Sequence, residues 1–334
     1  MINFHSRGFP YHRGRRLRQS KNFREIFSES SLTTNDLVMP YFLREEDDNA
    51  EIDGMPGMRR YNEKEIINEL KSTIDLGIKS IAIFPKVPDK KKSEEAEEAL
   101  NNSNLICRTL RKIKNKFPDL IVICDIALDS YTNSGHDGIL NSMGQIDNDK
   151  TIEQLAKMAV LFATNGCDVV APSDMMDGRV KIIRNQLEKE KKINTCILSY
   201  SAKFCSNFYA PFREALGSKE KIGKSSKSTY QINYKNKYEA INESLEDIFE
   251  GADIVMVKPA GYYLDVLSEL RKNCSIPLAA YQVSGEYSMI KIASDKKILD
   301  YKNCVLESLH CIKRSGADLI FSYFSKEVAG WINK

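Results

Sequence analysis

Two lysines occupy positions where a parallel sheet would hold reactive groups. Lys203 follows the apolar run CILSYSA, and Lys258 lies within VMVKP, near the end of another apolar run. Neighbouring strands are about 4.8 Å apart, so the two amines would be close if these runs are adjacent strands. Burial and a nearby like charge both lower the pKa of a lysine, and a neutral amine attacks a carbonyl carbon to form a Schiff base.

Each lysine also has a simpler explanation. Lys203 taken alone could be a surface loop residue, because the chain contains 49 lysines and arginines. Lys258 interrupts an apolar strand, and lysine is rarely buried without a reason. A functional role is therefore favoured for Lys258, and a position on the adjacent strand favours one for Lys203.

A second chemical cluster follows a third apolar run, in residues 121–138, IVICDIALDSYTNSGHDG. It contains Asp125, Asp129, His136 and Asp137. These side chains could form a metal site, an acid/base cluster or an ordinary solvated loop. Asp125 lies toward the end of the predicted strand, near the lysines, which favours proton transfer or amine binding for it.

Eight short, nearly continuous apolar runs supply the strands that would position these residues. Runs of this kind are typical of strands buried on both faces. The predicted strands are residues 37–43, 80–85, 121–128, 168–173, 196–201, 253–259, 278–284 and 319–324.

Helical patterns lie between the runs, and four of them end at a glycine shortly before the next strand. These glycines are Gly77, Gly166, Gly251 and Gly316. Glycine is preferred just after a helix because it adopts the left-handed conformation without a Cβ clash. The weak repeat supports a regular alternation of helices and strands.

This alternation predicts parallel strands, and eight of them close a barrel. We predict an eight-stranded parallel (β/α)8 TIM barrel over residues 35–334, with its active site at the carboxyl ends of the strands. An open doubly wound sheet is the alternative fold. No G-x-G-x-x-G follows any strand, which counts against a dinucleotide-binding version of that sheet.

Two segments fall outside the alternation. Residues 1 to about 34 are predicted to form an extended N-terminal arm, which needs a partner to be ordered because it has little apolar content. Residues 203 to about 238 form an overlong connection rich in Gly, Ser and Lys. Long loops in compact domains are often functional, so we predict an active-site lid there.

Composition narrows the class of protein. The chain of 334 residues is 42% hydrophobic and 28% charged, with a net charge of only +3, so we do not expect a general nucleic-acid or membrane binder. The longest apolar runs are far shorter than the roughly 18 to 20 residues that a membrane span needs. The basic N-terminus lacks the apolar core of a secretory signal; a structural arm is favoured over a transit peptide. Eight cysteines without a C-x-x-C pair favour reduced thiols and a cytosolic location.

Several longer motifs together resemble one enzyme family, delta-aminolevulinic acid dehydratase (porphobilinogen synthase). The resemblance covers essentially the whole chain, from GRRLRQS to the C-terminal helix. The motifs that carry it are ILSYSAKF, FYAPFREALGS, VMVKPAGYYLD, YQVSGEY, VLESLHCIKRSGADLIFSYF and APSDMMDGRV.

The resemblance implies a barrel enzyme that condenses two molecules of 5-aminolevulinate into porphobilinogen, an early step of tetrapyrrole (haem) synthesis. It also implies a homo-oligomer, usually an octamer, in which the arm wraps a neighbouring subunit. Lys258 and Lys203 match the two lysines that form Schiff bases with the substrates.

The same resemblance implies two sites for substrate carboxylates. Arg213 and Lys227 match lid cations, with Gln231 in the same lid, and Ser284 and Tyr323 match the pair that binds the other carboxylate. The family often has Arg where this chain has Lys227, and Lys lacks the bidentate fork of Arg. A closed lid would exclude water and protect the imines.

The metal content follows from the same comparison. Ala127, Asp129 and Asp137 stand where zinc-dependent members have three cysteines, and a thiolate zinc site needs those cysteines. We therefore expect no catalytic zinc. The chain resembles the aspartate-containing, magnesium-stimulated branch, in which Glu243 matches the ligand of an allosteric Mg²⁺. Whether Asp129 and Asp137 bind an ion is left open.

Two other functions are compatible with a barrel. A class I aldolase-like enzyme would use one lysine, and the second lysine and the two carboxylate sites argue against it. A catalytically silent assembly or metabolite-binding barrel would have lost at least one chemical residue, and this chain retains all five of Lys203, Lys258, Arg213, Ser284 and Tyr323. If the source is eukaryotic, an organelle stroma replaces the cytosol as the expected location.

Overall fold

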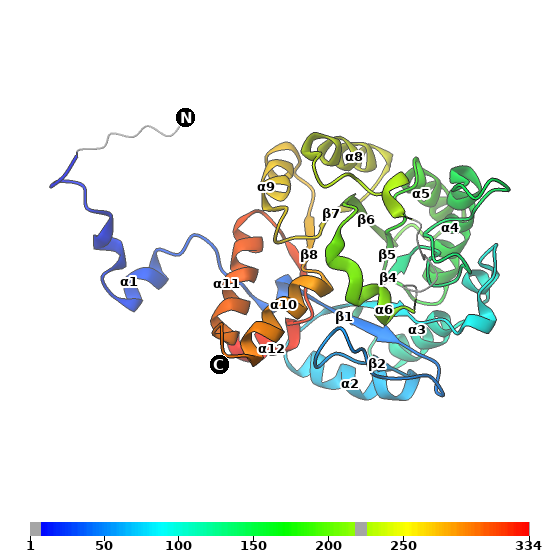
Figure 1. The fold of residues 1–334 in the computed structure, drawn as a ribbon, viewed down its shortest axis with the longest axis horizontal. Coiled ribbons are helices and arrows are strands. Elements are labelled where there is room, and N and C mark those ends of the chain that lie inside the picture. Colours follow the sequence, from blue (N-terminus) through cyan, green and yellow to red (C-terminus); the bar gives the residue numbers. More distant parts are fainter. Residues whose placement is uncertain (1–7, 218–225, 334) are drawn as a thin grey trace. The chain divides into compact units, whose positions relative to one another are not determined.

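Eight parallel strands form a closed barrel in the larger of two compact units of the chain, Leu32–Lys334 (Figure 1). The structure is a computed structural model that describes residues 8–217 and 226–333. Residues 1–7 of the predicted arm and 218–225 of the predicted lid lie outside the described residues. Each strand pairs with the next, and the first pairs with the last. This closure confirms the barrel and excludes an open doubly wound sheet.

All eight predicted strands are present, with small differences at their ends. The sixth labelled strand reaches Lys203, two residues beyond its predicted end. A two-residue strand that was not predicted, β2 (Arg60–Tyr61), pairs with the end of the first. The barrel strands are β1 (Leu37–Leu43), β3 (Ser80–Pro85), β4 (Ile121–Ile126), β5 (Val169–Pro172), β6 (Cys196–Lys203), β7 (Ile254–Lys258), β8 (Leu278–Tyr281) and β9 (Leu319–Phe321).

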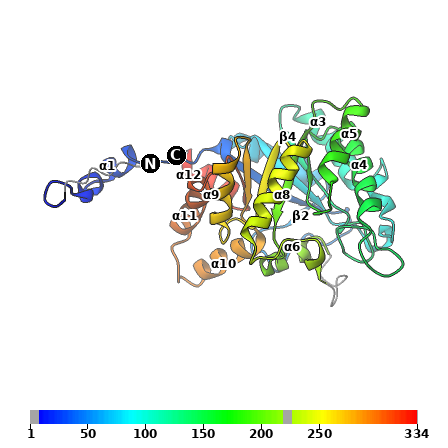
Figure 2. The same cartoon turned by 90° about the horizontal axis from the view of Figure 1, so that it is seen from above.

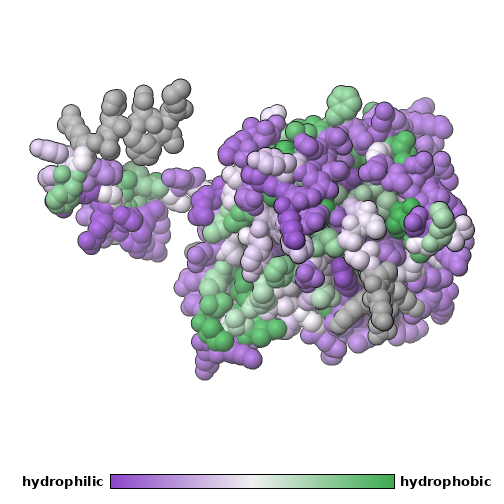
Figure 3. All heavy atoms as spheres, turned by 45° about the horizontal axis from the view of Figure 1, so that its top comes forward, coloured by the Kyte–Doolittle hydropathy of each residue, from purple (hydrophilic) through white to green (hydrophobic). Residues whose placement is uncertain are grey.

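Helices surround the strands, as Figures 1 and 2 show. The longer ones, such as residues 105–116 and 148–164, bury mainly apolar residues on one side, as amphipathic helices do; most residues on the face drawn in Figure 3 are hydrophilic. Within the described residues, the α-helices of the larger unit are α2 (Glu63–Asp75), α3 (Leu105–Lys116), α4 (Asn148–Thr164), α5 (Arg179–Lys189), α6 (Ala210–Ala215), α8 (Lys237–Glu250), α9 (Leu264–Asn273), α10 (Ser284–Asp295), α11 (Tyr301–Arg314) and α12 (Ser325–Ile332).

The strands are buried because both of their faces are covered. Every residue of β1, β3 and β5 is buried, which explains why the sequence shows continuous rather than alternating apolar runs. Polar groups therefore enter the barrel mainly at the strand ends, where Lys203 and Lys258 are the last residues of β6 and β7.

In the smaller unit, Met1–Ser31, the part from residue 8 onward contains one α-helix, α1 (Lys21–Ile26), which is capped by the Ser20 hydroxyl. No residue of this helix is buried. Large apolar side chains are exposed instead, including Phe9, Tyr11 and Ile26. The boundary lies close to the predicted end of the arm, but the oligomer contacts of the arm stay a prediction.

Within the described part of the chain, no helix combines the length and the apolar content that crossing a membrane requires.

The four glycines that end helices all have positive φ, between 83° and 115°. Gly316 has the largest value, and a Cβ built on it would lie 2.8 Å from the Cβ of Arg271. An L-residue in the left-handed region costs roughly 1–2 kcal/mol. The glycine pattern read from the sequence thus reflects a backbone requirement.

We expect Gly316→Ala to lower the free energy of unfolding by about 1–3 kcal/mol, through both backbone strain and the contact with Arg271. Gly330→Ala is the control, because Gly330 lies inside α12 and a Cβ there meets nothing closer than 3.8 Å. Urea unfolding at one protein concentration measures both. Equal stability of the two variants would contradict the argument.

Candidate active site

The two lysines lie side by side at the carboxyl ends of adjacent strands. Lys203 on β6 is the register partner of Lys258 on β7. Both are buried, with 6% and 4% of their surfaces exposed. The adjacency predicted from the sequence is therefore present, and the two cationic groups share one buried region at the barrel mouth.

The amine of Lys258 is surrounded by aromatic rings. Its Nζ lies 4.3 Å from the ring centroid of Tyr281 and 4.6 Å from that of Phe212, with Tyr200 and Tyr209 at 4.9 and 5.5 Å. Burial, together with the charge of Lys203, lowers the pKa of Lys258 to about 7. A large fraction of this amine is neutral near pH 7 and can act as a nucleophile.

Lys203 has different surroundings. Its Nζ donates a hydrogen bond to the backbone carbonyl of Ser173, at the end of β5, and lies 3.7 Å from Oδ1 of Asp137. Polar and anionic partners thus face Lys203, whereas aromatic rings face Lys258. The two amines are neighbours in unlike environments.

Asp125, on β4, faces the same region. Burial, and to a smaller extent the charge of Asp129, raises the pKa of Asp125 to about 7, although both lysines oppose the shift. Its Oδ1 is buried and has no hydrogen-bond partner among the described residues. A carboxyl group that titrates near neutrality beside two amines is suited to carrying protons.

Asp129 and Asp137 form a buried ion cluster with Lys227. The Lys227 Nζ lies 3.2 Å from Oδ2 of Asp129 and 3.0 Å from Oδ2 of Asp137. Burial alone would raise the pKa of Asp137, but the Lys203 and Lys227 charges hold that pKa below its usual value. Burial would lower the pKa of Lys227, and the two carboxylates raise it.

A second contact joins the segment after β6 to the loop after β4. The hydroxyl of Tyr230 lies 3.0 Å from Nδ1 of His136 and accepts the backbone N–H of Asp137 at 3.4 Å. Lys227 and Tyr230 therefore dock one part of the predicted lid onto the loop that carries the aspartates.

The residues matched to carboxylate binding lie at other strand ends. Ser284 Oγ, at the start of α10, accepts the backbone N–H of Phe212 at 3.0 Å. This bond links α10 to α6, the helix that carries Arg213. The Tyr323 hydroxyl lies 3.0 Å from that of Tyr281. Both hydroxyls thus border the region of Lys258.

Glu243 and Gln231 line a separate cavity of about 610 Å³. Burial raises the pKa of Glu243 to about 7; Asp247, Glu246 and Asp177 add to the shift, and Arg179 opposes it. Gln231 is buried and its Oε1 has no hydrogen-bond partner among the described residues. Glu243 is therefore in an acidic setting away from the lysines.

The three positions that match zinc-binding cysteines hold an alanine and two aspartates. Ala127 is buried and provides no ligand atom. Asp129 and Asp137 already pair with the ammonium of Lys227. In residues 8–217 and 226–333, no three His, Cys, Asp or Glu side chains are grouped as metal ligands.

Sequence reasoning missed the aromatic surroundings of Lys258. Tyr200 and Tyr281 lie on β6 and β8, within runs that were treated only as core strands. Phe212 and Tyr209 come from the segment after β6. The sequence does place a tyrosine in each of the two strands that flank β7. Packing in the core accounts for these tyrosines equally well, so the sequence alone does not place them around Lys258.

The sequence model of one family, "Delta-aminolevulinic acid dehydratase", matches residues 11–331. This chain belongs to the delta-aminolevulinic acid dehydratase family. The chloroplastic members from Oryza sativa subsp. japonica and Physcomitrium patens are each 48% identical to it; each comparison covers 74% of the relative, with 95% and 96% of this chain respectively.

A solved structure of the family has the same fold. The delta-aminolevulinic acid dehydratase of Toxoplasma gondii ME49, in complex with the reaction product porphobilinogen, is 42% identical. It matches with a TM-score of 0.94 over 96% of this chain and 91% of that one. The family resemblance read from the sequence is thereby confirmed.

We expect Lys227→Met to destabilise the fold by about 3–5 kcal/mol at pH 7, because it removes the cation that both buried carboxylates share. A carboxylate whose pKa is lower in the folded protein stabilises the folded state at pH values above its unfolded pKa of about 3.9. This stabilisation is lost as the pH falls through the pKa of the carboxylate in the folded protein. The difference in the free energy of unfolding between the variant and the unaltered chain should therefore decrease below about pH 4.

Urea unfolding from pH 7 down to pH 3.5 measures this difference. Lys235→Met is the matched control, since Lys235 is an exposed lysine nearby in the chain. A Lys227→Met variant as stable as the control at pH 7 would show that the ion cluster contributes little.

Proposed function

We propose that this chain is a porphobilinogen synthase, which condenses two 5-aminolevulinate molecules with loss of two waters. Family membership supports the activity. The observation that carries the proposal is the buried pair Lys203 and Lys258, in register on β6 and β7, because two ketone substrates require two amines for two Schiff bases.

Lys258 is proposed to react as the free amine. Its nitrogen attacks the ketone carbon of one substrate, and loss of water from the carbinolamine leaves an imine. The pKa of about 7 makes the neutral amine available without a strong base. The aromatic rings around it exclude water, which slows hydrolysis of the imine.

Lys203 is proposed to bind the ketone of the other substrate. Asp125 stands beside both lysines, and its pKa of about 7 suits it to donate a proton to a leaving hydroxyl and to accept one afterwards. Two substrate amines also enter the site, and Asp125, Asp129 and Asp137 supply carboxylates for them.

The carboxylate groups of the substrates need cations or hydroxyls. We propose Arg213, Lys227 and Gln231 for one substrate, and Ser284 and Tyr323 for the other. Lys227 is engaged with Asp129 and Asp137, so a substrate carboxylate has to share its ammonium with the two aspartates. The lid, residues 203 to about 238, is proposed to close over both substrates.

The metal content is proposed to follow the aspartate-containing branch. Ala127, Asp129 and Asp137 do not fit a thiolate zinc site, so no catalytic zinc is proposed. Glu243 fits a magnesium ion that keeps most of its waters, because it lines a cavity of about 610 Å³ together with two other acids, Asp177 and Glu239. Bound Mg²⁺ would neutralise this acidic group and act as an allosteric activator.

A homo-oligomer, in particular an octamer, is proposed for the assembly. The exposed Phe9, Tyr11, Phe23 and Ile26 of the first 31 residues support it, since a segment with so little buried surface gains order from a partner. The predicted division into an arm, residues 1–34, and a catalytic barrel, residues 35–334, fits this proposal.

The relatives from plants are chloroplastic by name. We therefore propose an organelle stroma as the location if the source is eukaryotic, and the cytoplasm otherwise.

Borohydride reduction in the presence of 5-aminolevulinate should trap a substrate adduct on Lys258, located by peptide mass spectrometry. Lys258→Ala should lower the rate of porphobilinogen formation by on the order of 10⁴-fold or more, because the nucleophile is lost. Lys71→Ala, an exposed lysine on α2, should behave as the unaltered chain. Porphobilinogen formation without an adduct on either lysine would refute the proposed roles.

Glu243→Ala should retain the basal activity and lose stimulation by magnesium. The assay compares EDTA-treated protein with protein supplied with Mg²⁺ or Zn²⁺, and Glu307→Ala on α11 is the control for an exposed helix carboxylate. Strict dependence on zinc, or undiminished magnesium stimulation in Glu243→Ala, would overturn the metal assignment.

A further inference from the structure

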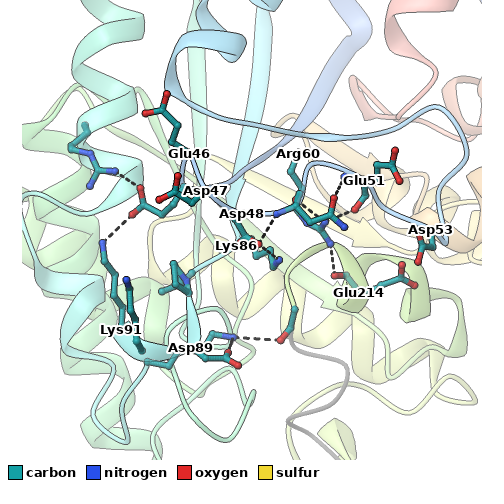
Figure 4. Close-up of a pocket in the computed structure, with 18 residues that line it drawn as sticks. Glu46, Asp47, Asp48, Glu51, Asp53, Arg60, Lys86, Asp89, Lys91 and Glu214 are labelled. Atoms are coloured by element: carbon teal, nitrogen blue, oxygen red, sulfur yellow. Dashed lines mark hydrogen bonds and ion pairs between the residues drawn. The ribbon is translucent and has the colours of Figure 1, made fainter.

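One buried arginine that the sequence did not single out joins two segments at the barrel mouth. Arg60, on the short strand β2, has 4% of its surface exposed. Its guanidinium lies at the edge of a polar cleft of about 1080 Å³, close to Glu51 and Glu214 (Figure 4). The described hydrogen bonds of Arg60 all go to backbone carbonyls.

Two of these carbonyls belong to the end of α6. Arg60 Nε donates to the carbonyl of Ala215 at 2.6 Å, and Nη2 donates to that of Glu214 at 2.8 Å. The last carbonyls of a helix have no partner within the helix, and a cation there is favourable. Arg60 therefore caps α6 from 155 residues away.

The other two carbonyls belong to the loop before β2. Arg60 Nη1 donates to the carbonyl of Asn49 at 3.2 Å and to that of Glu51. The same loop contacts α6 again, because the Gly54 N–H donates to Oε1 of Glu214 at 3.2 Å. The guanidinium thus fixes the loop and the helix end in one arrangement.

The position of α6 matters to the candidate chemistry. This helix has only six residues and cannot be stable by itself. It carries Phe212, whose ring centroid lies 4.6 Å from Nζ of Lys258, and Arg213, proposed above to hold a substrate carboxylate. Any shift of α6 would displace both side chains.

The loop also joins α6 to α10, where Ser284 begins the helix. The Ser288 hydroxyl donates to the carbonyl of Gly54 at 2.6 Å, and the Tyr287 hydroxyl donates to that of Pro56. Ser284 in turn accepts the N–H of Phe212. The loop held by Arg60 therefore braces the two helices that carry the proposed carboxylate-binding residues.

We propose that Arg60 is a positioning residue for substrate binding: it holds α6 so that Arg213 meets the substrate carboxylate and Phe212 lies against Lys258. This inference rests on the proposed function, but the anchoring of α6 is a property of the unliganded chain. Arg60 touches no reacting atom in this role.

The test compares Arg60→Met, which keeps the length of the side chain and removes every donor, with Arg60→Lys, which keeps the charge. Arg59→Met is the matched control, because Arg59 is exposed and pairs with Glu65. Amide hydrogen exchange in peptides spanning residues 208–217 is measured without substrate. We expect exchange about tenfold faster or more in Arg60→Met, less in Arg60→Lys, and no change in the control.

Steady-state kinetics follow with the same variants. KM for 5-aminolevulinate should rise about tenfold or more in Arg60→Met, with kcat changed less than about threefold and borohydride trapping on Lys258 retained. Unchanged exchange and unchanged KM in both Arg60 variants would overturn the proposal. If Arg60→Met does not fold, Arg60→Lys decides by the same two measurements. If the unaltered chain forms no porphobilinogen, the proposed function fails, while the exchange data still test the anchoring.

Discussion

Two lysine side chains buried next to each other constrain the whole site. Moving one ammonium out of water is costly, and a second one beside it adds repulsion. The register of β6 and β7 fixes Lys203 and Lys258 as neighbours, so the surrounding residues have to make that arrangement tolerable. The site meets this requirement in two different ways.

Lys258 is accommodated mainly by losing its charge, and Lys203 by gaining partners. Burial and the charge of Lys203 favour the neutral form of the first amine, which lies among aromatic rings. Asp137 and the Ser173 carbonyl face the second. Lys227, in the segment after β6, pairs with Asp129 and Asp137. Charge balance therefore links the segment after β6 to the loop after β4.

The sequence was sufficient to predict the barrel and the lysine pair, because these depend on local signals. Continuous apolar runs mark strands buried on both faces, and glycines such as Gly316 mark helix ends where only glycine is relaxed. Lys258 was detectable as a charge within an apolar strand. Closure of the barrel by pairing of β1 with β9 needed only the strand count.

Other features could not be predicted because they depend on long-range contacts with no sequence signature. Arg60 contacts a helix end 155 residues away through backbone carbonyls. Every residue type has such a carbonyl, so the sequence does not reveal the contact. Lys227 was expected to be available for a substrate carboxylate, and its pairing with Asp129 and Asp137 depends on how the lid segment docks. The tyrosines around Lys258 are indistinguishable in sequence from ordinary core residues.

The central claim is that proximity to Lys203 and burial together make Lys258 a neutral nucleophile near pH 7. Competitive acetylation of the intact protein across pH 5–11, quantified for the Lys258 peptide by mass spectrometry, measures the pKa of this amine directly. The account predicts a midpoint of about 7 in the unaltered chain and a higher midpoint in Lys203→Met, where the neighbouring charge is gone. A midpoint near the ordinary lysine value of about 10.4 in both proteins would contradict it.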